Sequence, residues 1–350
     1  MLHIAISDRA QTCILLKGCE YMSDLIEQYK DLKPKLERLE ANILTTLKQI
    51  INKKETPIFA IESRVKENES LINKIARKNY QSPFEEIDDL CGIRIICYYQ
   101  EDISNICKII ESEFEILKKE NKQDDLKDNQ FGYSSYHYII QLKKEWLVYP
   151  TARGLDNLRA EVQIRTMLMH TWSAISHKLL YKIKSDVPPQ FIRKLNRLSA
   201  LIELADEQFD AIKNSKAQYH NDLSNSPEGF DSSAELNSDS LIALHKHYFN
   251  NRTYSDNDIP SLLDEIRYSD YTLKQLVNSI ELCLPVLNNM EKEEADGIEA
   301  NLPMWNFPGV IRTILDLTSE KYFEARSNSL PHELHDIRNK YRKIIDESQR

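Results

Sequence analysis

Residues Arg159–Lys182, RAEVQIRTMLMHTWSAISHKLLYK, contain the pattern that decides the fold of the surrounding chain. In the first part polar and apolar residues alternate, which is typical of a half-buried β-strand. The polar side of this strand carries an acid, an amide and a guanidinium: Glu161, Gln163 and Arg165. Thr166 is positioned to cap a helix, because helical spacings follow it. This segment alone leaves two interpretations open, a site for chemistry or an edge strand with a solvated face.

The bulk composition fits a globular protein. With 350 residues, 41% of them hydrophobic, the chain can bury a sizeable core, and its length predicts two or three domains. The net charge of -9 argues against a large non-specific nucleic-acid surface but allows a local basic cleft. The six cysteines include no CxxC pair and no zinc-type array, which indicates reduced thiols. No apolar run is long enough to span a membrane, so we expect a soluble, cytoplasmic protein.

Hydrophobic periodicity divides the chain into four parts. Residues 1–21 precede the first clear helical stripe and form an extension of uncertain order. Residues 22–217 are the main domain, in which helical and strand-like patterns are mixed. Residues 218–240 lack Lys and Arg and predict an acidic, polar linker. Residues 241–350 predict a small all-helical C-terminal module, with helices near 241–250, 260–267, 271–292, 308–325 and 331–347.

Basic side chains gather around residue 70. Arg64 and Lys66 alternate at the end of a short predicted strand, and a helix opens after them near Glu67. One face of that helix carries Ser70, Lys74 and Arg77 at one-turn spacings. A basic helix face is often only solvated surface. The functional interpretation is a polyphosphate clamp, because Arg and Lys are the side chains that bind triphosphate oxygens.

A carboxylate stands at the entrance of the next predicted strand, which covers about Ile93 to Tyr99. Asp89 precedes this strand, and a helix with apolar periodicity follows it. Such a carboxylate is often only a turn former. Together with Glu161, however, Asp89 is a candidate ligand for Mg²⁺, which proteins hold with one or two carboxylates while substrate phosphates complete the coordination.

Aromatic and polar residues alternate in FGYSSYHYIIQLKKE, which leads into a predicted strand at residues 136–143. Tyr133, Ser135 and His137 share one side, which suits stacking and hydrogen bonding, while Tyr138 lies on the side expected to face a core. An exposed tyrosine can stack on a nucleobase. Tyr133 could equally be a packing residue.

Five motifs occur together in the order and spacing of RelA/SpoT-type alarmone synthetases: SRVKENESLINKIARK, DDLCGIRIICYY, FGYSSYH, EVQIRTMLMHTW and SHKLLYK. The resemblance covers residues 22 to about 215 and is specific as a set. It implies an α+β fold in which helices wrap a mixed β-sheet, here followed by the all-helical C-terminal module. It also implies a GTP pyrophosphokinase, a transferase that uses Mg²⁺ to move the β,γ-pyrophosphate of ATP to the 3'-hydroxyl of GDP or GTP. The (p)ppGpp produced is the alarmone of the stringent response.

The resemblance assigns roles to individual positions. Asp89 and Glu161 resemble the catalytic carboxylates that approach the metal, and Glu161 also orients the attacking hydroxyl. Residues that resemble the ATP contacts are Arg64, Lys66, Ser70, Lys74, Arg77 and Arg94. Residues that resemble the acceptor contacts are Tyr133, which stacks on guanine, together with His137, Gln163 and Arg165. Small members of the family often assemble, so we also expect a homo-oligomer.

Two departures from the family pattern leave more than one molecule possible as the acceptor of the pyrophosphate. Ser176 stands where the family usually has Glu before His, and Ser134 stands where many members carry Arg or Gln. Both changes predict a weaker grip on an acceptor polyphosphate. Some relatives are toxins that pyrophosphorylate the 3'-CCA end of tRNA or make adenosine alarmones, and a C-terminal module could regulate such an enzyme. A degenerate protein that only binds nucleotides is the third interpretation.

Overall fold

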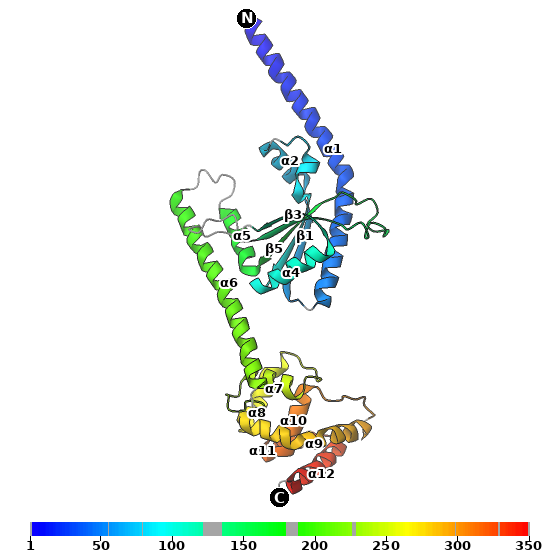
Figure 1. Ribbon diagram of the computed structural model, residues 1–350, viewed down its shortest axis with the longest axis vertical. Coiled ribbons are helices and arrows are strands. Elements are labelled where there is room, and N and C mark those ends of the chain that lie inside the picture. Colours follow the sequence, from blue (N-terminus) through cyan, green and yellow to red (C-terminus); the bar gives the residue numbers. More distant parts are fainter. Residues whose placement is uncertain are drawn as a thin grey trace. The chain divides into compact units, whose positions relative to one another are not determined.

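The chain forms two compact units, Met1–Ala211 and Ile212–Arg350 (Figure 1). The first unit contains a β-sheet, and the second contains helices. The computed structural model describes residues 2–54, 56–78, 80–121, 135–179, 188–225, 229–297, 299–327 and 330–348.

The first unit is built on a five-stranded mixed sheet in the order β1-β2-β5-β4-β3. Only β2 and β5 run parallel among the described pairs, and the other neighbours are antiparallel. The strands are β1 (Ile58–Val65), β2 (Cys91–Cys97), β3 (Glu115–Asn121), β4 (Tyr136–Gln141) and β5 (Ala160–Thr166). The mixed sheet implied by the family resemblance is therefore confirmed. Its central strand is β5, which carries Glu161, Gln163 and Arg165.

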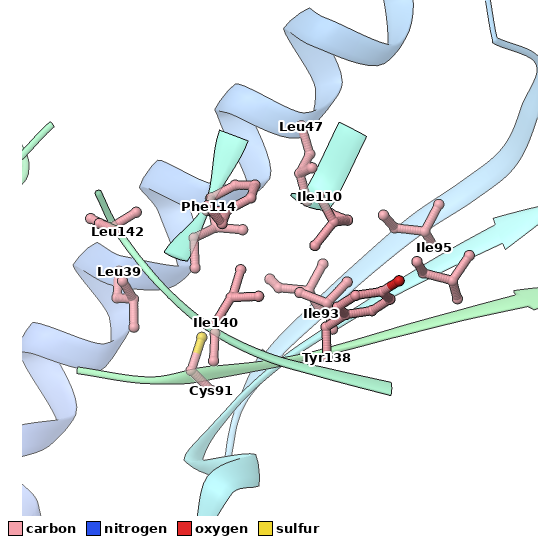
Figure 2. Packing of buried hydrophobic residues seen from close by; sticks show 14 of the residues in the cluster. Leu39, Leu47, Cys91, Ile93, Ile95, Ile110, Phe114, Tyr138, Ile140 and Leu142 are labelled. Atoms are coloured by element: carbon pink, nitrogen blue, oxygen red, sulfur yellow. The ribbon is translucent and has the colours of Figure 1, made fainter. Parts of the chain in front are cut away.

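One face of the sheet is buried beneath two helices, α1 (Leu2–Lys53) and α4 (Gln100–Glu113). Figure 2 shows Leu39 and Leu47 of α1 and Ile110 of α4 above Ile93 and Tyr138 of the sheet. Burying each large apolar side chain stabilises the fold by roughly 1.5–3 kcal/mol. Because strand residues alternate between faces, this packing leaves the polar residues of β1, β2 and β5 on the opposite face.

The remaining helical elements of this part of the chain lie between β1 and β2 or after β5. Between β1 and β2 come α2 (Asn68–Arg77), α3 (Pro83–Glu86) and the 3-10 turn η1 (Asp88–Leu90), and β5 is followed by α5 (Met167–Leu179) and the long α6 (Pro189–Ser224). Thr166 caps α5 as expected, because its Oγ1 accepts a hydrogen bond of 3.1 Å from the Met169 backbone N–H. The same hydroxyl donates to Asp206 Oδ2 of α6 at 2.6 Å.

Two local differences from the expected first unit have simple causes. Residues 118–121 belong to β3, although their polar sequence predicts no strand. This strand lies at the edge of the sheet and exposes most of its side chains, so it lacks an apolar signal. In addition, α1 begins at Leu2, so the expected extension 1–21 is continuous with the helix that follows.

In its described residues the second unit contains six further helices with their own apolar core. They are α7 (Ser238–Tyr248), α8 (Asp258–Tyr268), α9 (Leu273–Gly297), α10 (Phe307–Thr318), α11 (Glu320–Ser327) and α12 (His332–Ser348). The single helix expected at 308–325 is broken at Ser319, whose backbone is extended. The Ser319 hydroxyl accepts from the Tyr322 N–H at 3.3 Å, so serine caps the second piece.

The expected linker 218–240 contributes to this second unit. Its first seven residues continue α6 to Ser224. Phe230 and Leu236 are buried in the helical core, and Asn237 caps α7 through a reciprocal pair of hydrogen bonds with Ser240. Phe230 and Leu236 attach the segment to this core. The average composition of residues 218–240 is polar and does not reveal the effect of two single apolar residues. None of the described helices is long and apolar enough to cross a membrane.

Candidate active site

The strand register lines up the polar side chains across the sheet. Arg64 of β1 lies opposite Gly92 of β2, which in turn lies opposite Glu161 of β5. The next row on this face, two residues along each strand, consists of Glu62, Arg94, Gln163 and His137. Because β2 and β5 are parallel, the turn before β2 and the start of β5 meet at the same end of the sheet. The register therefore brings Asp89, just before β2, to the end that carries Glu161.

Asp89 is held by two lysines. Lys66 Nζ lies 2.8 Å from Asp89 Oδ2, and Lys74 Nζ lies 2.7 Å from Oδ1. Burial opposes ionisation of this carboxyl, but the hydrogen bonds from the two ammonium groups keep its pKa below the usual value. Asp89 is therefore an ionised carboxylate at neutral pH.

The Glu161 carboxylate contacts a histidine and an amide. His137 Nδ1 lies 2.8 Å from Glu161 Oε1, and Gln163 Nε2 donates to Oε2 at 3.0 Å. Ser135 Oγ lies 2.5 Å from the other ring nitrogen of His137, so the imidazole is fixed at both ends. Burial raises the pKa of Glu161, but the His137 contact outweighs it and the pKa is lowered overall. Glu161 is thus ionised as well.

Two pockets share these carboxylates. The first, of about 240 Å³, is lined by Asp89 and Glu161 together with Glu62, Ser63, Arg64, Gly92, Ile93, Arg94 and Gln163. The second, of about 250 Å³, is lined by Asp89 and Glu161 together with Lys74, Lys78, Tyr80, Glu86, Asp88, Lys118, Glu120, His137 and Ile139. Two small molecules could therefore approach the same pair of acids from different sides.

The predicted ATP contacts lie at different places in the structure. Arg64 and Arg94 line the first pocket, and Lys74 lines the second. Lys66 is buried and reaches Asp89. Two further predicted contacts, Ser70 and Arg77, are exposed on α2 and are not among the described residues that line either pocket.

The predicted acceptor contacts also differ in position. His137 and Gln163 flank Glu161, as expected from the alternation in their strands. Arg165 is 4% exposed, and its guanidinium donates to Gln163 Oε1, so it supports the Gln163 side chain. Tyr133 and Ser134 lie outside the described residues. Ser176 is buried on α5 and donates to the Ser173 carbonyl at 3.2 Å.

Several pocket residues escaped the sequence analysis. Glu62 lines the first pocket and accepts from Arg94 Nη1 at 2.9 Å. Its period-2 spacing from Arg64 could have revealed it, because both residues occupy the same face of β1. Lys118 and Glu120 line the second pocket from β3 and carried no such signal, because the strand itself was not predicted.

The two carboxylates suit Mg²⁺. Both are ionised, both line the same pockets, and each is partly accessible, which leaves room for substrate phosphates to complete an octahedral shell. No cluster of three or more His, Cys, Asp or Glu side chains that could hold a metal occurs in the described part of the chain. Two carboxylates suit Mg²⁺ because proteins often hold this ion with one or two acids while substrate phosphates complete the coordination.

Comparison with known proteins gives a consistent family. A family described as a region found in RelA / SpoT proteins matches residues 63–186. The chain is 35% identical over 163 residues to GTP pyrophosphokinase YwaC of Bacillus subtilis, covering 45% of this chain and 74% of the relative. It is 29% identical over 163 residues to GTP pyrophosphokinase YjbM of the same organism, covering 45% and 73%.

Among solved structures, small alarmone synthetase 1 from Bacillus subtilis bound to its product pppGpp is 26% identical, with a TM-score of 0.48. The similarity covers 55% of this chain and 99% of that one. The sequence relatives carry the assignment, because the similarity extends over most of each relative's length. The family match, over residues 63–186, includes both carboxylates. The chain belongs to the GTP pyrophosphokinase family of RelA/SpoT-type proteins.

Proposed function

We propose that the protein transfers the β,γ-pyrophosphate of ATP to the 3'-hydroxyl of GDP or GTP and so makes (p)ppGpp as a stringent-response signal. The observation that carries this proposal is the pair of pockets that share Asp89 and Glu161. A group transfer between two nucleotides requires two binding sites that meet at the reacting atoms. The names of the relatives, GTP pyrophosphokinases, support a guanine nucleotide as the acceptor.

In the proposed reaction the 3'-oxygen of the acceptor attacks the β-phosphorus of ATP. A new bond forms between this oxygen and the β-phosphorus, the bond from the β-phosphorus to the oxygen shared with the α-phosphate breaks, and AMP leaves. The hydroxyl proton is released. Arg64, Lys66, Lys74 and Arg94 would neutralise the donor phosphates, which is the main contribution a protein makes to phosphoryl transfer. The more distant Ser70 and Arg77 would contact them only at the rim.

Glu161 would orient the attacking hydroxyl by accepting its hydrogen bond. Its lowered pKa makes it a weak base, so alignment and charge stabilisation contribute more than full proton removal. His137 and Gln163 hold the carboxylate in place. Arg165 would act through Gln163, and Tyr133 would stack on the acceptor base.

Asp89 and Glu161 would hold Mg²⁺ together with the donor phosphates. When bound, the ion supplies positive charge to the phosphate oxygens as negative charge develops on them. Lys66 and Lys74 already neutralise Asp89 before substrate arrives, and this arrangement keeps an ionised ligand ready in a partly buried site.

A labelled-transfer assay tests the proposal. Purified protein, Mg²⁺ and ATP labelled on the γ-phosphate would be incubated separately with GDP, GTP, ATP and bulk tRNA. We expect label to move to GDP and GTP and to stop moving when the metal is chelated. Label on tRNA 3' ends or on adenosine nucleotides would replace the guanine acceptor with that of the toxin-type relatives. Absence of transfer to every acceptor would overturn the proposed activity and support the degenerate interpretation.

We also propose that the protein functions as a homo-oligomer in the cytoplasm, where its proposed substrates occur. Support comes from apolar side chains that α6 leaves exposed: Leu198, Leu201 and Phe209 are 51%, 61% and 50% accessible. Contiguous exposed apolar residues commonly mark association surfaces. Sedimentation at micromolar concentration should give more than one copy, and Leu201→Lys should shift the protein toward the monomer. A wild-type protein that sediments as a monomer would contradict this assignment.

A further inference from the structure

Tyr29 joins helix α1 to the turn that carries Lys66. Its hydroxyl donates a hydrogen bond of 2.5 Å to the Lys66 backbone carbonyl, and the side chain is 0% exposed. Its ring stacks on Phe84 of α3 with a centroid distance of 6.1 Å and an interplanar angle of 3°. The tyrosine is therefore fixed by packing on one side while its polar tip reaches the edge of the active site.

The Lys66 turn is held from both directions. The Lys66 N–H donates to the Leu90 carbonyl at 2.9 Å, next to Asp89, and its carbonyl accepts from Tyr29. With the backbone fixed, the ammonium group reaches Asp89 Oδ2 at 2.8 Å. A second contact from α1, Lys33 Nζ to Glu67 Oε2 at 3.1 Å, falls on the same turn but is far more exposed. Tyr29 is thus the buried contact from α1 that sets where Lys66 lies.

We propose that Tyr29 is a positioning residue: through the Lys66 carbonyl it holds the Lys66 ammonium group where it meets Asp89 and the phosphates of ATP. This inference rests on the proposed function, because it assigns Lys66 to the donor nucleotide. Tyr29 itself contacts neither substrate nor metal. Its effect is to pre-organise a cation whose long side chain would otherwise sample many rotamers.

The choice of tyrosine at this position supports the proposal. A leucine would continue the apolar stripe of α1 equally well, but it would leave the Lys66 carbonyl without its donor. Burial, together with the nearby charge of Glu67, raises the pKa of Tyr29 to about 12, so its hydroxyl keeps its proton throughout the physiological range. The hydrogen bond from Tyr29 to the Lys66 carbonyl is therefore present at every physiological pH.

Tyr29→Phe removes only the hydroxyl and provides the test. The matched control is Tyr138→Phe, because Tyr138 is also 0% exposed and donates to a carboxylate, Glu111 Oε1 at 2.8 Å, on the core side of the sheet. Binding of a non-hydrolysable ATP analogue would be measured by calorimetry for wild type and both variants. Thermal unfolding, and the KM values for ATP and for the acceptor, would be measured alongside.

We expect Tyr29→Phe to weaken binding of the ATP analogue about 5- to 20-fold, because a Lys66 ammonium group that is no longer held in place loses part of its charge-assisted contact with the phosphates. The KM for ATP should rise with it, while the KM for the acceptor changes less than twofold. Tyr138→Phe should bind the analogue like wild type, even if its melting temperature falls by as much as that of Tyr29→Phe.

Two results would overturn the inference. One is unchanged ATP-analogue binding in Tyr29→Phe, and the other is an equal loss of binding in Tyr138→Phe, which would indicate a general effect of destabilisation. If instead wild type itself fails to bind the analogue, the assignment of ATP as donor is wrong. The experiment therefore separates failure of this inference from failure of the proposed function.

Discussion

The two units of the molecule use pairs of carboxylates and cations in opposite ways. In the first unit, the side chains of Asp89 and Glu161 are 23% and 19% exposed, line two pockets and have lowered pKa values. In the second unit, Glu294 and Asp316 are 0% exposed, and both carry raised pKa values because they are buried. A charged pair alone does not indicate chemistry, since access to solvent and substrate decides what it does.

The depth of burial explains the difference. Asp89 pairs with two lysines, each within 2.8 Å, and remains partly exposed. In the second unit, Arg338 of α12 contacts both Glu294 of α9 and Asp316 of α10, and Asp316 also pairs with Arg326 of α11 at 2.9 Å, but both acids are fully buried. One oxygen of Asp316, Oδ1, is buried without a hydrogen-bond partner in the described part of the chain. This cluster joins three helices, and burial outweighs the attraction in setting the pKa of its acids.

Replacing the acid at each place gives the strongest test of this contrast. Glu161→Gln keeps the size of the side chain but removes its charge, so turnover should fall about 10³- to 10⁴-fold while the melting temperature changes little. The matched variant Glu294→Gln, in the second unit, should retain turnover at 25 °C. Transfer rates and thermal unfolding of both variants check this. A large loss of stability in Glu161→Gln with normal turnover would remove the distinction.

The next largest effect is expected from the cation of the buried cluster. Arg338→Leu removes the arginine paired with Glu294 and one of the two arginines paired with Asp316, so the free energy of unfolding of the helical unit should fall by about 3–5 kcal/mol. Chemical denaturation monitored by circular dichroism measures the loss. Lys340→Leu is the control on the same helix, because its pair with Glu293 is exposed and should contribute little. Equal effects of the two changes would show that burial does not matter here.

A smaller, pH-dependent effect is expected at Asp206, a buried acid of the first unit. Burial raises its pKa to about 6, above the ordinary 3.8, so the folded state holds this proton more tightly than the unfolded chain. The stability from Asp206 is therefore complete below pH 4 and is lost as the pH rises through 6. Asp206→Asn should remove this loss, on the order of 3 kcal/mol.

Denaturation of wild type and Asp206→Asn at several values between pH 4 and 8 measures the difference. The curves should diverge as the pH rises, with the variant relatively more stable at pH 8. Parallel curves would mean that Asp206, despite being 2% exposed, behaves like the accessible acids of the active site.

The smallest effect is expected at Gly92, between Arg64 and Glu161. A Cβ placed there would lie 3.8 Å from Arg64 Cγ, an ordinary contact, so Gly92→Ala should fold normally. The added methyl group would project into the first pocket, and the KM for ATP should rise about fivefold. Steady-state kinetics with thermal unfolding checks both parts. An unchanged KM would indicate that the donor does not approach this part of the pocket.

Most of the active-site frame could be predicted from local patterns. The alternation in β5 identified the face of Glu161 and Gln163, and the carboxylate before β2 identified Asp89, because side-chain period and strand entry are local properties. The pockets extend this frame with Glu62, whose spacing in β1 was also visible in the sequence.

The remainder depended on contacts distant in sequence. Nothing local distinguishes Arg165, which supports Gln163, from a residue that contacts substrate, because its burial is a property of the folded chain. Tyr29 has no local feature that marks its role, because its partner Lys66 is 37 residues away in the sequence. The edge strand β3 has a polar sequence because only one of its edges is paired.

The wall shared by the two pockets has a consequence for inhibitor design. Since Asp89 and Glu161 line both cavities, the two sites are adjacent. A single compound that links a donor-like and an acceptor-like fragment would present the second fragment at a high effective concentration once the first is bound. Such a bisubstrate compound does not require tight binding of either fragment alone. This property suits a chain in which Ser176, at a position where the family usually has Glu, predicts weaker binding of the acceptor.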